Sequence, residues 1–203
     1  MVAGVLALVA IVTVLGPGAA APAMADPGCP EPSLCVVPPY FQSAANGLYV
    51  SAEQGYRGSN SRMLRARARD LGAWEAFAAA PMPNLSDGST QCAYPPPAGW
   101  GCSGSIVIRS LDSRLYVSAE LAYGGMYYGE LRARATEIGP WELFDSYYLL
   151  GVAITQPDVH AYRSQANGLF VSTELNYRDS NYGMLRARAT EIGPWERFYG
   201  VIW

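Results

Sequence analysis

The sequence predicts an all-β fold built from three similar units of about four strands each. Three observations support this: one stretch is written three times, each copy alternates with a period of two, and turn residues separate the alternating segments. The stretch "LRARATEIGPWE" begins at Leu131 and again at Leu185, and a divergent copy, "LRARARDLGAWE", begins at Leu64. A motif that recurs along a chain indicates one supersecondary unit used repeatedly.

The repeat extends well beyond this stretch, without a gap, over 29 residues in each copy. Every copy carries a Ser, a Glu, a Tyr, a Leu, a Trp and a Phe at the same offsets from an aromatic residue. The matched positions are Tyr49, Tyr116 and Phe170; Ser51, Ser118 and Ser172; Glu53, Glu120 and Glu174; Tyr56, Tyr123 and Tyr177; Leu64, Leu131 and Leu185; Trp74, Trp141 and Trp195; Phe77, Phe144 and Phe198.

The segments "YVSAE" and "LRARA" each alternate with a period of two, which indicates half-buried strands. In the first copy we expect Val50 and Ala52 to face the core. Glu53 then lies on the solvent face beside Arg65 and Arg67, one strand away in a hairpin. Such cross-strand ion pairs contribute roughly 0.2–1 kcal/mol each.

Turn residues and flanking segments complete each unit. Asn46-Gly47 and Asn167-Gly168 supply the positive φ that a tight turn needs, whereas the middle copy has Ser113-Arg114 there. Upstream runs such as "SIVIRS" predict a further strand, and "WELF" predicts a fourth. Three copies therefore predict about twelve short strands.

The succession "ANGLYVSAE", "LRARA" and G-x-W-E-x-F resembles the fascin-like branch of the β-trefoil superfamily, over Val36 to Trp203. The resemblance implies a single β-trefoil of three four-stranded repeats with pseudo-threefold symmetry. The repeats would span about 36–82, 103–150 and 156–203, with an inserted loop at 83–102. It also implies that the chain binds or cross-links actin filaments.

The tryptophan and phenylalanine of each copy are expected to pack together in the core, near the threefold axis or against the barrel wall. The tryptophans concerned are Trp74, Trp141 and Trp195. The alternative is that these rings form a platform for a ligand.

The first 25 residues are predicted to be a secretory signal peptide, followed by an N-terminal extension at 26–35. "VAGVLALVAIVTVL" is an apolar run, and Ala23 and Ala25 form an A-x-A cleavage signature. An uncleaved anchor or a misassigned start is the alternative, because no Lys or Arg precedes the run. A secreted, extracellular protein without stable membrane insertion is therefore expected.

Four cysteines remain after the predicted cleavage: Cys29, Cys35, Cys92 and Cys102. An even number in an exported chain indicates disulfides, and three pairings are possible. Short sequence separation favours Cys29–Cys35 and Cys92–Cys102. The second pair would close the inserted loop, whose Tyr94 and Trp100 are candidates for contact with a partner, unless the loop is only a stapled excursion.

The sequence offers little for catalysis. His160 is the only histidine, and its position in the repeat predicts a strand residue and not a general base. The glutamates come in symmetric triplets, which suggests a role in the scaffold. No metal-ligand spacing or phosphate-binding loop is present, so we expect no enzyme activity, metal or cofactor. The net charge of −3, with 14 basic residues that are all Arg, argues against nucleic acid as a partner.

Binding is the remaining class of function, and the variable hairpin tips at 54–63, 121–130 and 175–184 are the candidate site. The tips are polar and rich in Tyr, a composition that suits sugars because pyranose faces stack on aromatic rings. A polymeric carbohydrate is the predicted partner; the alternatives are actin or another protein, or a purely structural role. The candidate ligand-binding residues are Tyr56, Arg57, Asn60, Tyr123, Tyr127, Tyr128, Tyr177, Arg178, Asn181 and Tyr182.

Overall fold

The computed structural model describes residues 40–83, 89, 91–152 and 158–200, which belong to a compact unit spanning Val36–Trp203. The predicted signal peptide, the N-terminal extension and the Cys29–Cys35 pair lie outside the described residues. Twelve strands occur in the described part: β1 (Gln42–Ser43), β2 (Tyr49–Glu53), β3 (Met63–Ala68), β4 (Phe77–Pro81), β5 (Trp100–Ser110), β6 (Tyr116–Glu120), β7 (Glu130–Ala135), β8 (Phe144–Leu149), β9 (Val159–Ser164), β10 (Phe170–Glu174), β11 (Met184–Ala189) and β12 (Phe198–Tyr199).

Short 3-10 turns are the only helical elements in these residues. One turn occupies each hairpin tip and another precedes the last strand of each unit. They are η1 (Gly58–Asn60), η2 (Ala73–Glu75), η3 (Gly125–Tyr127), η4 (Pro140–Glu142), η5 (Asp179–Asn181) and η6 (Pro194–Glu196).

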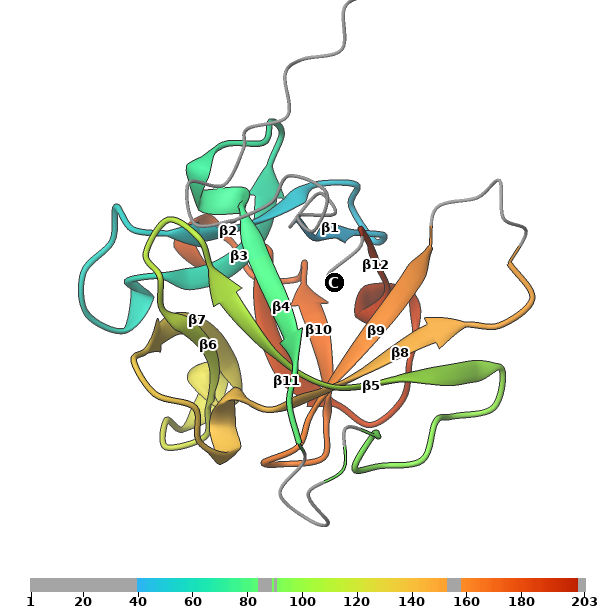
Figure 1. The fold of residues 1–203 in the computed structure, drawn as a ribbon. Coiled ribbons are helices and arrows are strands. Elements are labelled where there is room, and N and C mark those ends of the chain that lie inside the picture. The colour runs from blue at the N-terminus through green and yellow to red at the C-terminus, as the bar shows by residue number, and fades with distance from the viewer. Residues whose placement is uncertain (1–39, 84–88, 90, 153–157, 201–203) are drawn as a thin grey trace, which may run out of the picture. The chain divides into compact units, whose positions relative to one another are not determined.

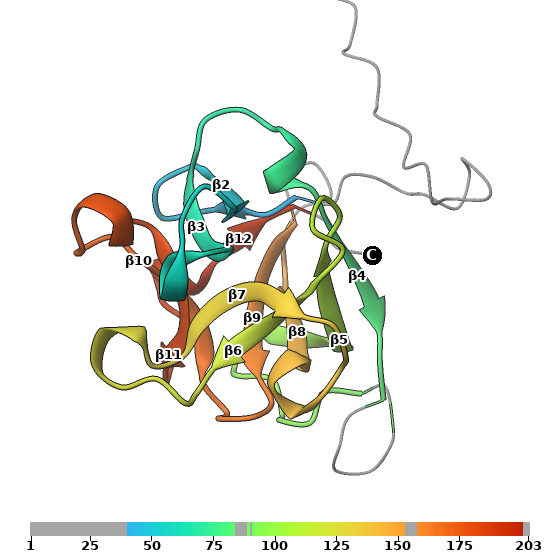
Figure 2. The ribbon, with the colours of Figure 1, turned by 90° about the vertical axis from the view of Figure 1, so that its left-hand side faces the viewer.

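The first and last strands of the units form a barrel (Figure 1). Their pairings with one another are antiparallel: β1 with β12, β12 with β9, β9 with β8, β8 with β5, and β5 with β4. The two middle strands of each unit form the hairpins β2–β3, β6–β7 and β10–β11 (Figure 2). Three four-stranded units arranged in this way make a β-trefoil, which confirms the predicted fold class.

The hairpins meet through their second strands, because β3 pairs with β7, β7 with β11, and β11 with β3. We call these three strands the hairpin triplet. One backbone hydrogen bond recurs at each contact: Ala66 N–H donates to Gly183 O at 2.7 Å, Ala133 N–H to Arg62 O at 2.9 Å, and Ala187 N–H to Gly129 O at 2.7 Å. A Cβ at Gly129, whose φ is +75°, would lie 2.5 Å from the Ala187 carbonyl oxygen, so this crossing requires glycine.

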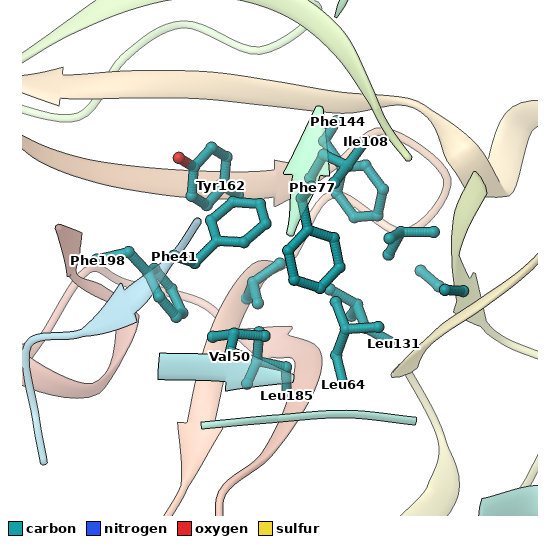
Figure 3. Close-up of a cluster of buried hydrophobic side chains, with 14 of the residues drawn as sticks. Phe41, Val50, Leu64, Phe77, Ile108, Leu131, Phe144, Tyr162, Leu185 and Phe198 are labelled. Carbon is teal, nitrogen blue, oxygen red and sulfur yellow. The ribbon is translucent and has the colours of Figure 1, made fainter. Parts of the chain in front are cut away.

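The core lies between the barrel and the hairpin triplet and repeats the threefold pattern (Figure 3). Its aromatic layer contains the phenylalanine that occupies the same position in each repeat. These residues are Phe77, Phe144 and Phe198, and all three are fully buried. Alternating residues of the hairpins complete it, as the period of two predicts: Val50, Val117 and Val171; Leu64, Leu131 and Leu185; Ala66, Ala133 and Ala187.

The tight turns take the backbone conformation that the sequence predicts. Gly47 and Gly168 have φ of 67° and 68°, and Arg114 adopts the same left-handed region with φ of 59°. Asn46 stabilises its turn twice, since its Oδ1 accepts from Leu48 N–H at 3.0 Å and its Nδ2 donates to the Ala66 carbonyl at 2.8 Å. The side chain therefore ties the first turn to the hairpin triplet.

The inserted loop is closed by the predicted Cys92–Cys102 disulfide. Buried Asp145 anchors it, because its carboxylate accepts hydrogen bonds from the Ala93 and Tyr94 amides at 3.0 and 2.9 Å. The loop is therefore docked on β8, and its last residues belong to β5.

For Trp100 the structure favours the alternative of a stapled loop over contact with a partner. Its side chain is only 7% exposed and packs with Tyr147 and Phe170 in a second apolar cluster. Tyr94 is half-buried beneath the Arg163 guanidinium, whose Cζ lies 4.1 Å from the ring centroid. Both aromatic residues serve to hold the loop.

Replacing Phe144 with alanine should lower the free energy of unfolding by about 3–5 kcal/mol, because the ring is fully buried in the core. Urea unfolding of the parent and the variant measures this difference. A loss below about 1 kcal/mol would contradict the placement of the phenylalanines in the core.

Candidate functional site

A glutamate–arginine pair lies on the same face of every hairpin. Glu53 pairs with Arg67 and, at 3.3 Å, with Arg65. The equivalent pairs in the other units are Glu120 with Arg134 at 2.6 Å and Glu174 with Arg188. The predicted cross-strand pairing is therefore present.

The prediction that this face is exposed to solvent is wrong. Glu53, Glu120 and Glu174 are all buried, because the 3-10 turns η2, η4 and η6 pack on the first strand of each hairpin, which carries the glutamate. Burial raises the pKa of Glu120 and Glu174, while Arg134 and Arg188 oppose that rise. The second arginine of each "LRARA" reaches solvent: the Arg67 side chain is 28% exposed, and those of Arg134 and Arg188 are 43% exposed.

The first arginine of each "LRARA" has a different role, because it is buried and crosses to the tip of another unit. Arg132 donates from Nε to Ser61 O and from Nη2 to Gly58 O, each at 3.0 Å. The other two units repeat this contact: Arg186 Nε donates to Tyr128 O at 3.0 Å, Arg186 Nη2 to Gly125 O at 3.2 Å, and Arg65 Nε to Ser180 O at 2.5 Å. We call this cyclic set the arginine ring.

The predicted tip tyrosines take part in this network. Tyr123 OH accepts from Arg132 Nη1 at 3.2 Å, and Tyr177 OH accepts from Arg186 Nη1 at 3.1 Å. The first unit differs, since Tyr56 OH accepts from Arg67 Nη2 at 2.8 Å. All three rings are half-buried, so part of each ring packs against the protein and part faces solvent.

The remaining predicted tip residues vary in exposure. Arg57 and Arg178 are exposed, whereas Asn60 and Asn181 are half-buried and each has an Oδ1 atom that is buried without a hydrogen-bond partner. Tyr127, Tyr128 and Tyr182 are also half-buried. The structure thus gathers the predicted residues into three equivalent tips, and their role in binding stays a prediction.

The expectation that the repeated tryptophans pack in the core is wrong for Trp74 and Trp195, which are each 41% exposed. The reason is the 3-10 turn that carries them. The glutamate that follows each tryptophan closes this turn with its side chain. Glu75 accepts a hydrogen bond from Gly72 N–H, and Glu196 accepts one from Gly193 N–H, both at 2.8 Å. The phenylalanine after this turn fills the core, and the indole is left outside. Trp141 is half-buried.

Each exposed indole forms one wall of a hollow, and the two hollows occupy equivalent positions in the first and third units. The third-unit hollow has a volume of about 410 Å³ and the first-unit hollow about 310 Å³. The lining positions that they share are Ser51 and Ser172, Arg67 and Arg188, Ala68 and Ala189, Trp74 and Trp195, and Glu75 and Glu196. We call these hollows the tryptophan clefts.

The tryptophan clefts combine an apolar ring surface with a charge-paired floor. In the first unit, the Glu53–Arg67 pair and Tyr56 lie in the cleft with Trp74. Sequence reasoning did not select these tryptophans as site residues, although it recognised a ligand platform as the alternative. Their invariance across the three copies is explained equally well by a core or by a surface, so the signal was ambiguous.

His160 is buried on β9, and burial lowers the pKa of its imidazole. It lines neither of the tryptophan clefts. Within the described ranges, no three His, Cys, Asp or Glu side chains gather as metal ligands do. No helix in the described part of the chain is long and apolar enough to cross a membrane.

Comparisons with protein-family models and with curated protein sequences find no match. Solved structures do match, and three of them illustrate the fold. The designed 3-fold symmetric protein ThreeFoil aligns with a TM-score of 0.52 and 10% identity, over 81% of this chain and 97% of its own. The SDF2-like protein from Arabidopsis thaliana aligns with a TM-score of 0.57 and 8% identity, over 80% of this chain and 90% of its own. A Caenorhabditis elegans protein of unknown function aligns with a TM-score of 0.54 and 12% identity, over 80% of this chain and 92% of its own. At these identities the likeness establishes the β-trefoil fold alone.

Replacing Arg132 with alanine should destabilise the protein by about 3–5 kcal/mol, because the tip carbonyls of Gly58 and Ser61 would lose the charged donor that the buried Arg132 side chain supplies. Thermal and urea unfolding measure the loss. Arg178→Ala is the control, since this exposed tip arginine should change stability by at most about 0.5 kcal/mol. Equal effects of the two variants would contradict the structural role of the arginine ring.

Replacing Trp195 with alanine should change the free energy of unfolding by less than about 1 kcal/mol, because the indole lies at the surface and leaves no core cavity. The same urea titration that measures Phe144→Ala provides the comparison. A loss as large as that of Phe144→Ala would place the indole in the core.

Proposed function

We propose that the protein is a secreted, non-catalytic module that binds a neutral polysaccharide in its tryptophan clefts. The observation that carries the proposal is the recurrence of one surface arrangement at equivalent places: an exposed indole beside a paired arginine and glutamate. The β-trefoil fold supplies the scaffold that repeats it.

The chemistry of the clefts suits a sugar ring. The C–H face of a pyranose is apolar and stacks on an indole, while its hydroxyl groups exchange hydrogen bonds with charged side chains. Arg188 offers guanidinium donors that are partly exposed, and its charge is balanced by Glu174. An ion-paired floor of this kind does not require a charged ligand, which favours a neutral polysaccharide.

One tip tyrosine, Tyr56, can contribute at the edge of its cleft. Tyr56 lines the first-unit cleft and its hydroxyl is held by Arg67. This places one of the aromatic residues predicted from the sequence next to Trp74. The proposed site is therefore centred on the tryptophan, with the tip as its border.

Repetition of the site favours a polymeric ligand. Each cleft is open and shallow, so a single sugar would be bound weakly. Sites repeated on one scaffold bind a repeating polymer more tightly through effective concentration, by about 10²–10⁴ over a single site. A chain of identical sugars would make use of this gain, whereas a monosaccharide would not.

The alternative proposal is that the module binds or cross-links actin filaments. It is favoured by the likeness of the G-x-W-E-x-F and "LRARA" motifs to fascin-like domains. The net charge of −3 and the absence of Lys weigh against it, because actin is acidic. Polysaccharide therefore remains the preferred partner.

Retention on insoluble polysaccharides tests the proposal. The parent protein should be retained on at least one neutral polysaccharide of a panel, and the Trp74→Ala/Trp195→Ala double variant should lose about tenfold or more of that retention. Its melting temperature should stay within a few degrees, because both indoles are exposed.

Leu150→Ala is the matched control, since Leu150 is an exposed apolar residue that lines neither cleft. Full retention of the double variant would exclude the clefts as the site. If the parent pellets with filamentous actin and with no polysaccharide, the actin alternative replaces the proposal.

A further inference from the structure

One unit of the hairpin triplet breaks the threefold pattern at its most buried position. Glu130 begins β7, and the residues at the equivalent starts of β3 and β11 are Met63 and Met184. All three side chains are 0% exposed. A carboxyl group therefore occupies a place that the other two units fill with an apolar thioether.

Neither carboxyl oxygen of Glu130 has a hydrogen-bond partner. Charged groups face it from every strand packed around it: Arg132 on its own strand, Glu120 on β6, Arg65 on β3, and Arg186 on β11, its register partner. The three arginines are already committed, because each donates to the backbone carbonyls of a hairpin tip.

The cost of ionisation follows from this geometry. A buried carboxylate without a hydrogen-bonded partner is unfavourable, so the group keeps its proton to higher pH than an exposed glutamate. Burial raises the pKa of the Glu130 carboxyl from an ordinary value of 4.5 to about 7, and Glu120 adds to the rise while the arginines oppose it. The group thus changes charge near neutral pH.

We propose that Glu130 is a proton-operated latch of the hairpin triplet: when protonated it lets the three hairpins close on an uncharged centre, and when it releases its proton their contacts loosen. The loosening reaches the tips, because the ionised carboxylate attracts Arg186 and Arg65 away from the tip carbonyls that they hold. This latch is independent of which ligand the module binds.

The direction of the pH dependence is determined by which state holds the proton. Between about pH 4.5 and 7 the folded protein keeps a proton that the unfolded chain has lost. Folding therefore takes up a proton in this window. The free energy of unfolding is therefore greatest below pH 4.5 and falls as the pH rises from 4.5 to 7. Above pH 7, Glu130 contributes no further change.

The test compares the full chain with Glu130→Met, which places at β7 the side chain already present at β3 and β11. From pH 4.5 to 8.5, the unfolding equilibrium constant of the parent, divided by that of the variant, should rise on the order of 10²-fold. Urea titrations at each pH measure this ratio. A constant ratio across the range would overturn the latch.

Two further variants separate the latch from a general effect of charge. Glu137→Gln removes an exposed carboxylate from the same unit and should leave the parent profile unchanged. Glu130→Gln keeps the shape and removes the titration, so its profile should follow that of Glu130→Met. A profile for Glu130→Gln that follows the parent would contradict the proposal even if Glu130→Met misfolds.

Amide hydrogen exchange locates the loosening. After correction for the intrinsic rates, the amides of Ala66, Ala133 and Ala187, which close the hairpin triplet, should lose protection above pH 7 in the parent and not in Glu130→Met. The amides of barrel strand β8 should lose less. Uniform loss across the barrel and the triplet would show that Glu130 affects global stability only, and would overturn the latch.

Discussion

The fold depends on the arginine ring. Arg65, Arg132 and Arg186 each leave their own hairpin and satisfy backbone carbonyls in the tip of a neighbouring unit. A guanidinium suits this task, because its planar fork offers five donors and can reach several carbonyls at once, whereas an ammonium is a compact point charge. The ring also explains why "LRARA" is repeated so closely. The arginine of each unit binds the tip of another unit, so a change in one copy affects two units.

The second arginine of the same strand shows how two residues of identical type take different roles. Arg132 and Arg134 are two positions apart and share a face of β7, yet the first is buried and the second reaches solvent. The buried one joins units, and the outer one pairs with Glu120 inside its own hairpin. The clefts lie where the outer arginines of the first and third units meet an exposed indole. In the first and third units, one strand therefore carries both an arginine that joins units and an arginine that lines a cleft.

The repeat period allowed the fold to be predicted, but it could not locate the site. Alternation placed Val50 and Leu64 in the core, and the glycine turns set the strand boundaries. The fate of the tryptophan was not predictable from periodicity, because G-x-W-E-x-F looks like a strand and forms a 3-10 turn that directs Trp74 and Trp195 outward. The burial of Glu53 was missed for a related reason. Coverage of the first hairpin strands by the 3-10 turns is a tertiary effect, and the alternation within a strand does not encode it.

Departures from symmetry carry information that the symmetric residues do not. In a threefold scaffold, positions that pack in the core or belong to the arginine ring require the same residue in each copy. A different residue at such a position is therefore either tolerated by its neighbours or has a role of its own. Glu130 is the clearest case, since two methionines show that an apolar side chain fits its place. A side chain that costs stability only when charged gives the centre of the triplet a dependence on pH that a symmetric core of three methionines would lack. At the clefts the symmetric residues raise a different question, because Trp74 and Trp195 recur while 41% exposed, so core packing alone does not account for them and the proposed binding of a polysaccharide would.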